Sequence, residues 1–263
     1  FSTRPAAMNS TLDSSPATPG KFTGGELLVG VGVLAVLGVL AYIQLRTNPG
    51  PALARSVQKI KLLSEAFTEY TADNGGLLPL EDVSGADDWS AAAKPEAEDV
   101  WYNALPKLMA AKTVGEIGKE DPEEFYQDPY PFFLPDAPYP KSDKKLTRPY
   151  FAVAMNSRLQ QQDEEGTKVR GSISSFLQPE STVVFLERGL PSDKKSSKVQ
   201  RGFDGSPKAG PFAFVGRRGG QGILVFMDGH IEAHSFADLV GKNGRIIAQD
   251  GIIWTANPED DPN

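Results

Sequence analysis

The sequence predicts an α+β fold in which a single N-terminal transmembrane helix continues, through a kink, into an amphipathic helix packed on a small antiparallel β-sheet domain with long loops. Three observations support this prediction. Residues 27–45 form an almost unbroken apolar run, and apolar side chains recur at helical spacing between Leu53 and Tyr70. Short strand-like segments separated by turn signals fill the chain after residue 149.

The composition argues against nucleic-acid binding and against sites built from cysteine or from many histidines. Of the 263 residues, 40% are hydrophobic, which is enough for a folded core, and the formal net charge is -7. An acidic chain is a poor partner for nucleic acid, because phosphate binding needs a basic surface. The sequence has no cysteine and only two histidines, which excludes disulfides, thiolate metal sites, cysteine nucleophiles and histidine-rich metal centres.

The N-terminal part of the chain consists of a polar tail, residues 1–21, and an apolar helix within residues 22–46. The tail is rich in Ser, Thr, Pro and Ala, so we expect it to order only against a partner. The apolar run Leu27–Leu45 has Gln44 as its one strongly polar residue. Nineteen helical residues extend about 28 Å, close to the hydrocarbon thickness of a bilayer. A buried core helix and a secretory signal are the alternatives, and we predict a membrane span.

One side of this apolar helix is formed by small residues, which allow another helix to approach closely in lipid. Glycine is also common in membrane helices without any such role. We predict that the chain packs on other transmembrane subunits through this glycine face and through its N-terminal tail. The lipid bilayer is its other predicted partner. The residues of the glycine face are Gly30, Gly32, Ala35, Gly38 and Ala41.

An amphipathic helix is predicted within residues 47–76, after the break at Asn48-Pro-Gly-Pro51. Its apolar side chains recur at steps of three and four, and Asp73-Asn-Gly-Gly76 is a typical C-terminal cap. The predicted buried stripe is Leu53, Val57, Ile60, Leu63, Phe67 and Tyr70.

Residues 77–148 are predicted to be rich in loops, acidic at first and then rich in proline and aromatic residues. A short helix is predicted from Val100 to Met109, although Pro106 lies inside it. The seven prolines and the aromatic side chains of residues 121–149 favour an extended loop packed on the domain. The alternative is an exposed proline-rich ligand for another protein.

A β-rich region is predicted for residues 149–256, followed by an acidic tail, residues 257–263. Its clearest signal is a hairpin with Asp228-Gly229 at the turn. The predicted strands are Pro149–Met155, Thr182–Leu186, Gly222–Phe226 and Ile231–Ser235, and the polar segment 191–210 between them contains Lys194, Lys195 and Lys198.

The sequence offers no catalytic constellation, so we predict a protein without enzymatic activity, cofactor or metal. His230 and His234 lie on one face of the predicted hairpin strand, and with Asp228 and Glu232 they represent the one conceivable metal site. Side chains on a strand surface usually bind no metal. Arg218 is interpreted as a hydrogen-bond donor beside the Asp228-Gly229 turn, in preference to an anion-binding residue.

Three stretches of the chain share one pattern when they are taken in order. They are Phe22-Thr-Gly-Gly-Glu26-Leu-Leu-Val, then Ala54-Arg-Ser-Val-Gln through Tyr70-Thr-Ala-Asp-Asn-Gly-Gly-Leu-Leu-Pro79, and finally Tyr150–Ser157, Gln178–Phe185 and Gly216–Glu232. Together they resemble type IV pilins and the pseudopilins of type II secretion, including a C-terminal domain named for a histidine, nine residues and Asp-Gly. The resemblance implies that Phe22 begins the mature protein and that Glu26 is the charged residue of the N-terminal helix.

Departures from the family pattern fall at its functional positions. Lys21 stands where the processing peptidase of pilins requires glycine, and Gly24 and Gly25 interrupt the aliphatic run. Arg218 replaces the histidine before Asp228. The sequence thus resembles a pilin that has lost its processing site. We expect residues 1–21 to remain uncleaved and Glu26 to lie at the membrane interface.

The resemblance implies a bacterial inner-membrane protein with a cytoplasmic N-terminus and a large domain in the periplasm or outside the cell. The basic residues predict the reverse, because more of them follow the apolar run than precede it. We follow the resemblance. The predicted function is that of a structural accessory or scaffold subunit of a larger membrane complex, in secretion or in photosynthetic or respiratory energy transduction. The alternatives are a processed pseudopilin that polymerises into a filament, and an adhesive or ligand-binding ectodomain.

Overall fold

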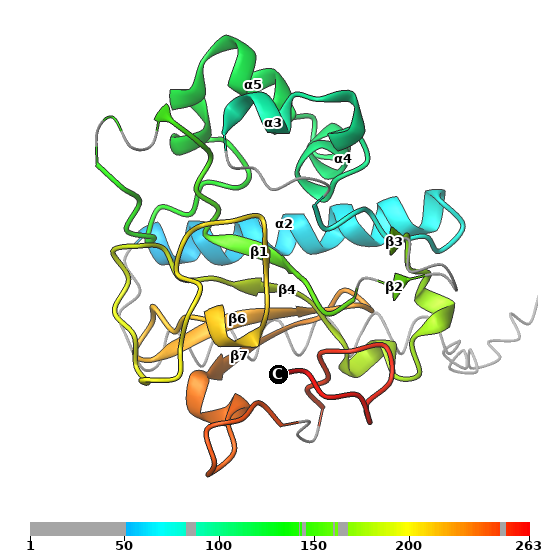
Figure 1. Ribbon diagram of the computed structural model, residues 1–263. Helices are drawn as coiled ribbons and strands as arrows, with labels where there is room; N and C mark the ends of the chain where they lie inside the picture. Colours follow the sequence, from blue (N-terminus) through cyan, green and yellow to red (C-terminus); the bar gives the residue numbers. More distant parts are fainter. Residues whose placement is uncertain are drawn as a thin grey trace, which may run out of the picture.

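The computed structural model describes residues 51–82, 88–141, 143, 146–159, 161–162, 168–247 and 251–263 (Figure 1). The polar tail, the predicted membrane span, the glycine face, Phe22 and Glu26 therefore lie outside the described residues. In the part of the chain that is described, no helix is both long and apolar enough to cross a bilayer. The described residues form an α+β fold around a five-stranded sheet.

The sheet has the strand order β5-β1-β4-β6-β7, and a separate ribbon pairs β2 with β3. It is mixed, which corrects the expected antiparallel sheet, because β5 runs parallel to β1. After β4 the chain reverses and passes over β1, so β5 joins the far edge of β1 in the same direction as β1. The strands are β1 Val153–Asn156, β2 Gln161–Gln162, β3 Lys168–Val169, β4 Val183–Glu187, β5 Lys208–Ala209, β6 Gln221–Phe226 and β7 Ile231–Ser235.

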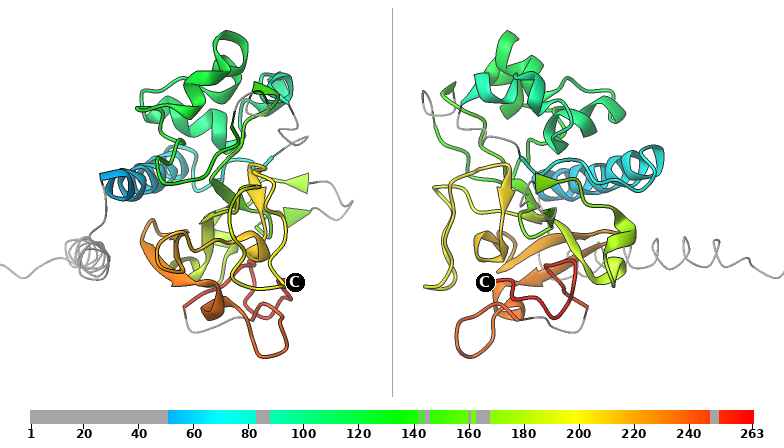
Figure 2. Two further views of the ribbon diagram at one scale, coloured as in Figure 1. Left: turned by 90° about the vertical axis from the view of Figure 1, so that its left-hand side faces the viewer. Right: turned by 45° about the vertical axis from the view of Figure 1, so that its right-hand side comes forward.

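The long helix α2, Pro51–Asp73, lies along one face of the sheet (Figures 1 and 2). Its predicted stripe is buried except for Leu53, which is partly exposed, and Ile60, Leu63 and Phe67 have 2% or less of their surface exposed. The helix ends at the predicted cap, where Gly75 and Gly76 adopt φ of 63° and 86° and the Gly76 amide donates to the Thr71 carbonyl at 2.7 Å. Both the helix and its buried face are confirmed.

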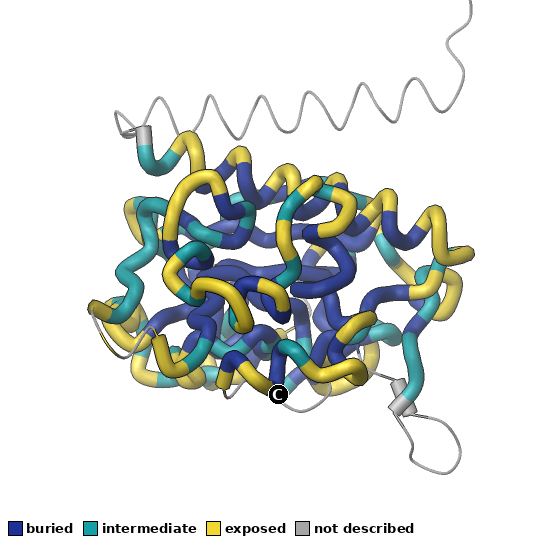
Figure 3. The backbone as a smooth tube through the Cα atoms, turned by 90° about the horizontal axis from the view of Figure 1, so that it is seen from above, coloured by how far each residue is buried: buried dark blue, intermediate teal, exposed yellow. Residues whose placement is uncertain are grey.

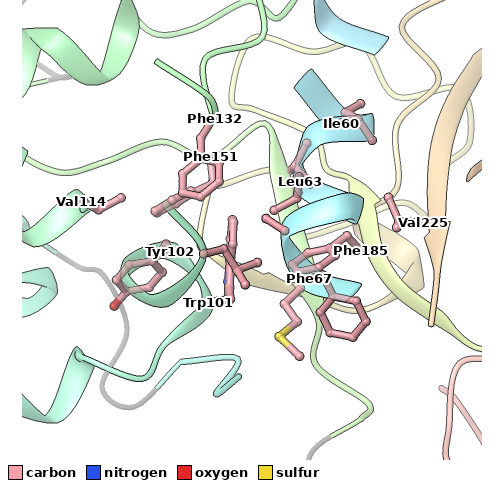
Figure 4. Packing of buried hydrophobic residues seen from close by; sticks show 14 of the residues in the cluster. Ile60, Leu63, Phe67, Trp101, Tyr102, Val114, Phe132, Phe151, Phe185 and Val225 are labelled. Carbon is pink, nitrogen blue, oxygen red and sulfur yellow. The ribbon is translucent and has the colours of Figure 1, made fainter. Parts of the chain in front are cut away.

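A helical lobe covers α2 and the same face of the sheet (Figure 1). Trp101 joins the lobe to the sheet, because its ring lies 5.3 Å from that of Phe185 in β4 and its Nε1 donates to the Pro207 carbonyl at 3.1 Å. Figure 4 shows Trp101 among aromatic rings from both sides. The predicted helix over Val100–Met109 is confirmed, with Pro106 inside it. The helices of the lobe are α3 Trp89–Ala92, α4 Trp101–Leu108 and α5 Val114–Glu120.

The aromatic segment after α5 packs inward. Phe125, Tyr126, Tyr130 and Phe132 are buried in the same core as α2, which confirms a loop packed on the domain and not an exposed ligand. A second, smaller core fills the opposite face of the sheet and includes Phe214 and Trp254. Seen from above, the buried segments gather in the interior of the molecule, and the exposed segments lie over them and around the rim (Figure 3). The two cores leave β6 covered on both faces.

Candidate functional site at the two ends of strand β6

The hairpin turn at Asp228-Gly229 follows strand β6 and rests on helix α2. The predicted pairing of β6 with β7 is confirmed, and Val225 lies opposite Ile231 beside the turn. Ser64 Oγ in α2 donates to the Gly229 carbonyl at 2.6 Å. Gly229 has φ of 91°, and a Cβ atom there would lie 2.7 Å from Thr68 Oγ1. Glycine is thus required both by the backbone conformation and by the closeness of α2.

A row of charged side chains extends from this turn along β7, and we call it the turn cluster: Asp228, His230, Glu232 and His234. His230 Nδ1 lies 2.6 Å from Asp228 Oδ1, and its Nε2 lies 3.6 Å from Glu232 Oε1. His234 Nε2 lies 2.8 Å from Glu232 Oε2. The His230 ring also stacks on Phe226, with centroids 4.2 Å apart and planes 4° from parallel. The two histidines therefore share one face, as expected from their spacing.

The hydrogen bonds of the turn cluster decide its charge. Burial alone would lower the pKa of His230, but hydrogen bonds to Asp228 and Glu232 outweigh that effect and raise the pKa to about 9. Hydrogen bonds from His230 and His234 lower the pKa of Glu232 to about 2. At neutral pH, His230 is therefore a cation held between carboxylates, and both of its ring nitrogens carry protons.

Arg218 lies before the start of β6, at the opposite end of the strand from the turn. The interpretation that it stands beside the Asp228-Gly229 turn is therefore wrong. A strand of this length separates its two ends by roughly 20 Å, farther than an arginine side chain extends. Arg218 instead forms a two-pronged ion pair with Glu187 of β4, in which Nη2 lies 2.8 Å from Oε1.

Around this pair is a network of buried charges, which we call the buried cluster: Glu187, Arg217, Arg218, Asp136 and Asp193. Arg218 Nη2 lies 2.9 Å from Asp136 Oδ2, and Arg217 Nη2 lies 2.6 Å from Asp193 Oδ2. The Ile223 amide of β6 donates to Glu187 at 2.8 Å. Burial alone would lower the pKa of Arg218, but Glu187 and Asp136 outweigh it and raise the pKa.

The buried cluster also joins the sheet to α2. Ser56 Oγ in the second turn of α2 donates to Asp136 Oδ1 at 2.5 Å, while Asp136 pairs with Arg218 through its other oxygen. Glu187, Asp136 and Asp193 are not among the site residues predicted from the sequence. A signal for Glu187 was present, since it ends an otherwise apolar strand, Val183–Leu186, and a buried carboxylate requires a cation.

The two clusters connect separate secondary-structure elements. In the described part of the chain, no group of three or more His, Asp or Glu side chains is arranged to hold a metal ion. A pocket between residues 78–81, β1 and β3 is lined by Leu78, Glu81, Met155 and Arg170. Its volume of about 20 Å³ accommodates one water molecule, whereas ligand pockets measure roughly 300 Å³ or more.

Gly229 is thus held on α2, with Asp228 and His230 beside it in the turn cluster, and Arg218 is placed at a separate junction with α2. Both junctions hold the same helix on the same sheet. No family model, no curated protein and no solved structure matches this chain.

Proposed function

We propose that this protein is a non-enzymatic structural subunit of a membrane complex, anchored by a single helix over residues 27–45 and derived from a pilin-like ancestor. In this proposal the transmembrane helix continues through a kink into α2, and α2 transmits the position of the anchor to the sheet domain. The large domain lies on the periplasmic or outer face of a bacterial inner membrane.

The observation that supports this proposal is the attachment of α2 at two places. Ser56 is tied through Asp136 to Arg218, and Ser64 is tied directly to the carbonyl of Gly229. These contacts lie at opposite ends of β6, so the helix is held against both tilting and sliding. Because α2 starts at Pro51, only residues 46–50 separate it from the apolar run. A helix fixed in this way is suited to carry a load between an anchor and a domain.

The anchor is tested by flotation of the full-length chain on lipid vesicles in a density gradient. The wild-type chain is expected to float and to resist extraction with alkaline carbonate. Replacing Leu34 and Leu37 with arginine places two charges within the apolar run, and we expect the chain to be extracted. Leu62→Arg is the matched control, because Leu62 is 43% exposed on α2. A wild-type chain that stays at the bottom of the gradient would contradict the anchor.

The role as a subunit is tested by purification from native membranes in mild detergent, followed by native electrophoresis. We expect other membrane proteins to co-purify with the wild-type chain. Filling the glycine face with Gly30→Leu and Gly38→Leu is expected to remove them while the chain still floats. Val31→Leu and Val39→Leu are the matched controls on the neighbouring face. If the wild-type chain migrates alone in native electrophoresis, the role as a subunit is contradicted.

The second candidate function is a processed pseudopilin that polymerises into a filament. It is favoured by the spacing of Phe22 and Glu26, which matches the N-terminus of mature pilins. The intact mass of the protein from native membranes distinguishes the two. Loss of residues 1–21 together with methylation at Phe22 would establish the filament subunit, and retention of Lys21 supports the accessory subunit.

A further inference from the structure

The segment between β4 and β5 contains a concentration of positive charge that contrasts with the acidic chain around it. We call residues 191–203 the basic loop. Lys194, Lys195, Lys198 and Arg201 are all exposed there, in a protein whose formal net charge is -7. Among the described residues, none of these four side chains forms an ion pair. The acidic residue of the loop, Asp193, is paired with Arg217 at 2.6 Å.

The basic loop is held in a defined shape by buried polar groups. Gln200 is 2% exposed, and its Oε1 accepts hydrogen bonds from the Ser196 amide at 2.7 Å and the Ser197 amide at 2.9 Å. Its Nε2 donates to the Phe214 carbonyl at 2.7 Å. The guanidinium of Arg201 lies 3.7 Å from the centre of the Phe212 ring. Long loops that are fixed in this way usually serve recognition, because an unused connection needs no such support.

The basic loop lies at the end of the domain where helix α2 begins. In Figures 1 and 2 the loop, drawn in yellow, lies on the same end of the molecule as the first turns of α2, drawn in blue. Contacts link the two: Asp193 pairs with Arg217, the neighbour of Arg218, and Arg218 reaches Ser56 of α2 through Asp136. If α2 follows a membrane anchor, this end of the domain is the one nearest the bilayer. Residues 46–50 extend at most about 18 Å.

We propose that the basic loop docks on anionic lipid headgroups beside the anchor and so fixes the tilt of the domain on the membrane. This inference rests on the proposed membrane anchoring. Lysine and arginine side chains close to an anionic surface are attracted to it within about a Debye length, near 8–10 Å at physiological salt. The helical lobe of α3, α4 and α5 carries exposed acidic residues, among them Glu96, Glu98 and Asp99, so the lobe is repelled by the same surface.

The test measures the distance of the loop from the headgroups in the full-length chain, reconstituted in phosphatidylcholine vesicles with or without phosphatidylglycerol. Because the sequence has no cysteine, Ser192→Cys provides a unique site for a fluorescent donor, with an acceptor on a lipid headgroup. Glu96→Cys provides the reference site on the helical lobe. Flotation of each labelled sample reports anchoring separately from docking.

Energy transfer from residue 192 is expected to rise about twofold or more when phosphatidylglycerol is present. The rise should disappear at 1 M salt, where the Debye length is about 3 Å. Replacing Lys194, Lys195 and Lys198 with glutamine should remove it as well. Glutamine at Lys94, Lys107 and Lys119, the matched control in the helical lobe, should leave it intact. Transfer from residue 96 should not rise with phosphatidylglycerol, because the acidic helical lobe is repelled by the same surface.

Two results would overturn docking while leaving the anchor in place. In the first, the chain floats but energy transfer from residue 192 is the same with and without phosphatidylglycerol. In the second, the triple glutamine variant shows the same rise in energy transfer as the wild type. Transfer that depends on the protein-to-lipid ratio in neutral vesicles would indicate contacts between copies of the chain and would also overturn docking on lipid. A chain that fails to float would overturn both the anchor and the docking.

Discussion

Strand β6 has a charged cluster at each end, and the two clusters differ in how far they are removed from water. In the buried cluster, the side chains of Arg218 and Glu187 are 7% and 0% exposed. In the turn cluster, Asp228 and Glu232 are 42% and 45% exposed. The buried cluster joins residues that are far apart in the sequence, whereas the turn cluster pairs residues two positions apart along the turn and β7. Burial determines how much each cluster contributes to the free energy of unfolding. Water screens the exposed charges, whereas a buried charge depends on its partner.

The largest effect is expected from breaking the buried cluster. Arg218→Ala leaves Glu187 buried without its two-pronged partner and should lower the free energy of unfolding by about 3–5 kcal/mol. Denaturant unfolding of the full-length chain in detergent measures the change. Lys94→Ala, at an exposed position, is the control and should alter stability by less than about 0.5 kcal/mol. The double variant Glu187→Gln with Arg218→Met should recover part of the loss. A cost below about 1 kcal/mol for Arg218→Ala would refute the importance of burial here.

A smaller effect is expected at the turn itself. Gly229→Ala combines a backbone at φ of 91° with a Cβ atom 2.7 Å from Thr68 Oγ1, and should cost about 2–3 kcal/mol. Gly220→Ala is the matched control, because Gly220 has φ of 89° and no neighbouring atom within 4 Å of the added Cβ. It should cost about 1 kcal/mol. Equal costs for the two variants would mean that α2 yields freely and is not held by the turn.

Breaking the turn cluster should cost less again. His230→Ala removes the ring that stacks on Phe226 and bonds to Asp228, and at pH 6 the expected loss is about 1–2 kcal/mol, reduced by the solvent exposure of its partners. His234→Ala, which loses one bond to Glu232, should cost less than about 1 kcal/mol. Thermal unfolding followed by tryptophan fluorescence ranks the two variants. The ranking is wrong if His234→Ala is the more damaging change.

The smallest effect is a dependence on pH that arises from the turn cluster. The pKa of His230 rises from 6.5 to about 9 on folding, so its contribution is complete below pH 6.5 and is lost as pH rises through 9. The pKa of Glu232 falls from 4.5 to about 2, so its contribution is complete above pH 4.5 and is lost as pH falls through 2. The stability difference between wild type and His230→Gln should therefore shrink between pH 6.5 and 9.5. A constant difference over that range would contradict the assigned charge of His230.

Local features of the sequence predicted the elements that local chemistry determines. The spacing of Val57, Ile60 and Leu63 identified the buried face of α2, because the helical period appears as a regular spacing of apolar residues within one continuous segment. Asp228-Gly229 identified the hairpin, because glycine supplies the positive φ that the turn requires. The parallel pairing of β5 with β1 could not be found in this way, since nothing in Lys208-Ala209 specifies which edge the strand joins.

The sequence by itself therefore determined α2, its buried face, the β6–β7 hairpin and the inward packing of the aromatic segment. Only the tertiary structure decided that Arg218 pairs with Glu187, 31 residues away, and that Asp136 meets Ser56, 80 residues away. The physical reason is range. Helical period and turn geometry arise from neighbours along the chain, whereas a buried charge is satisfied by whichever opposite charge the fold brings to it.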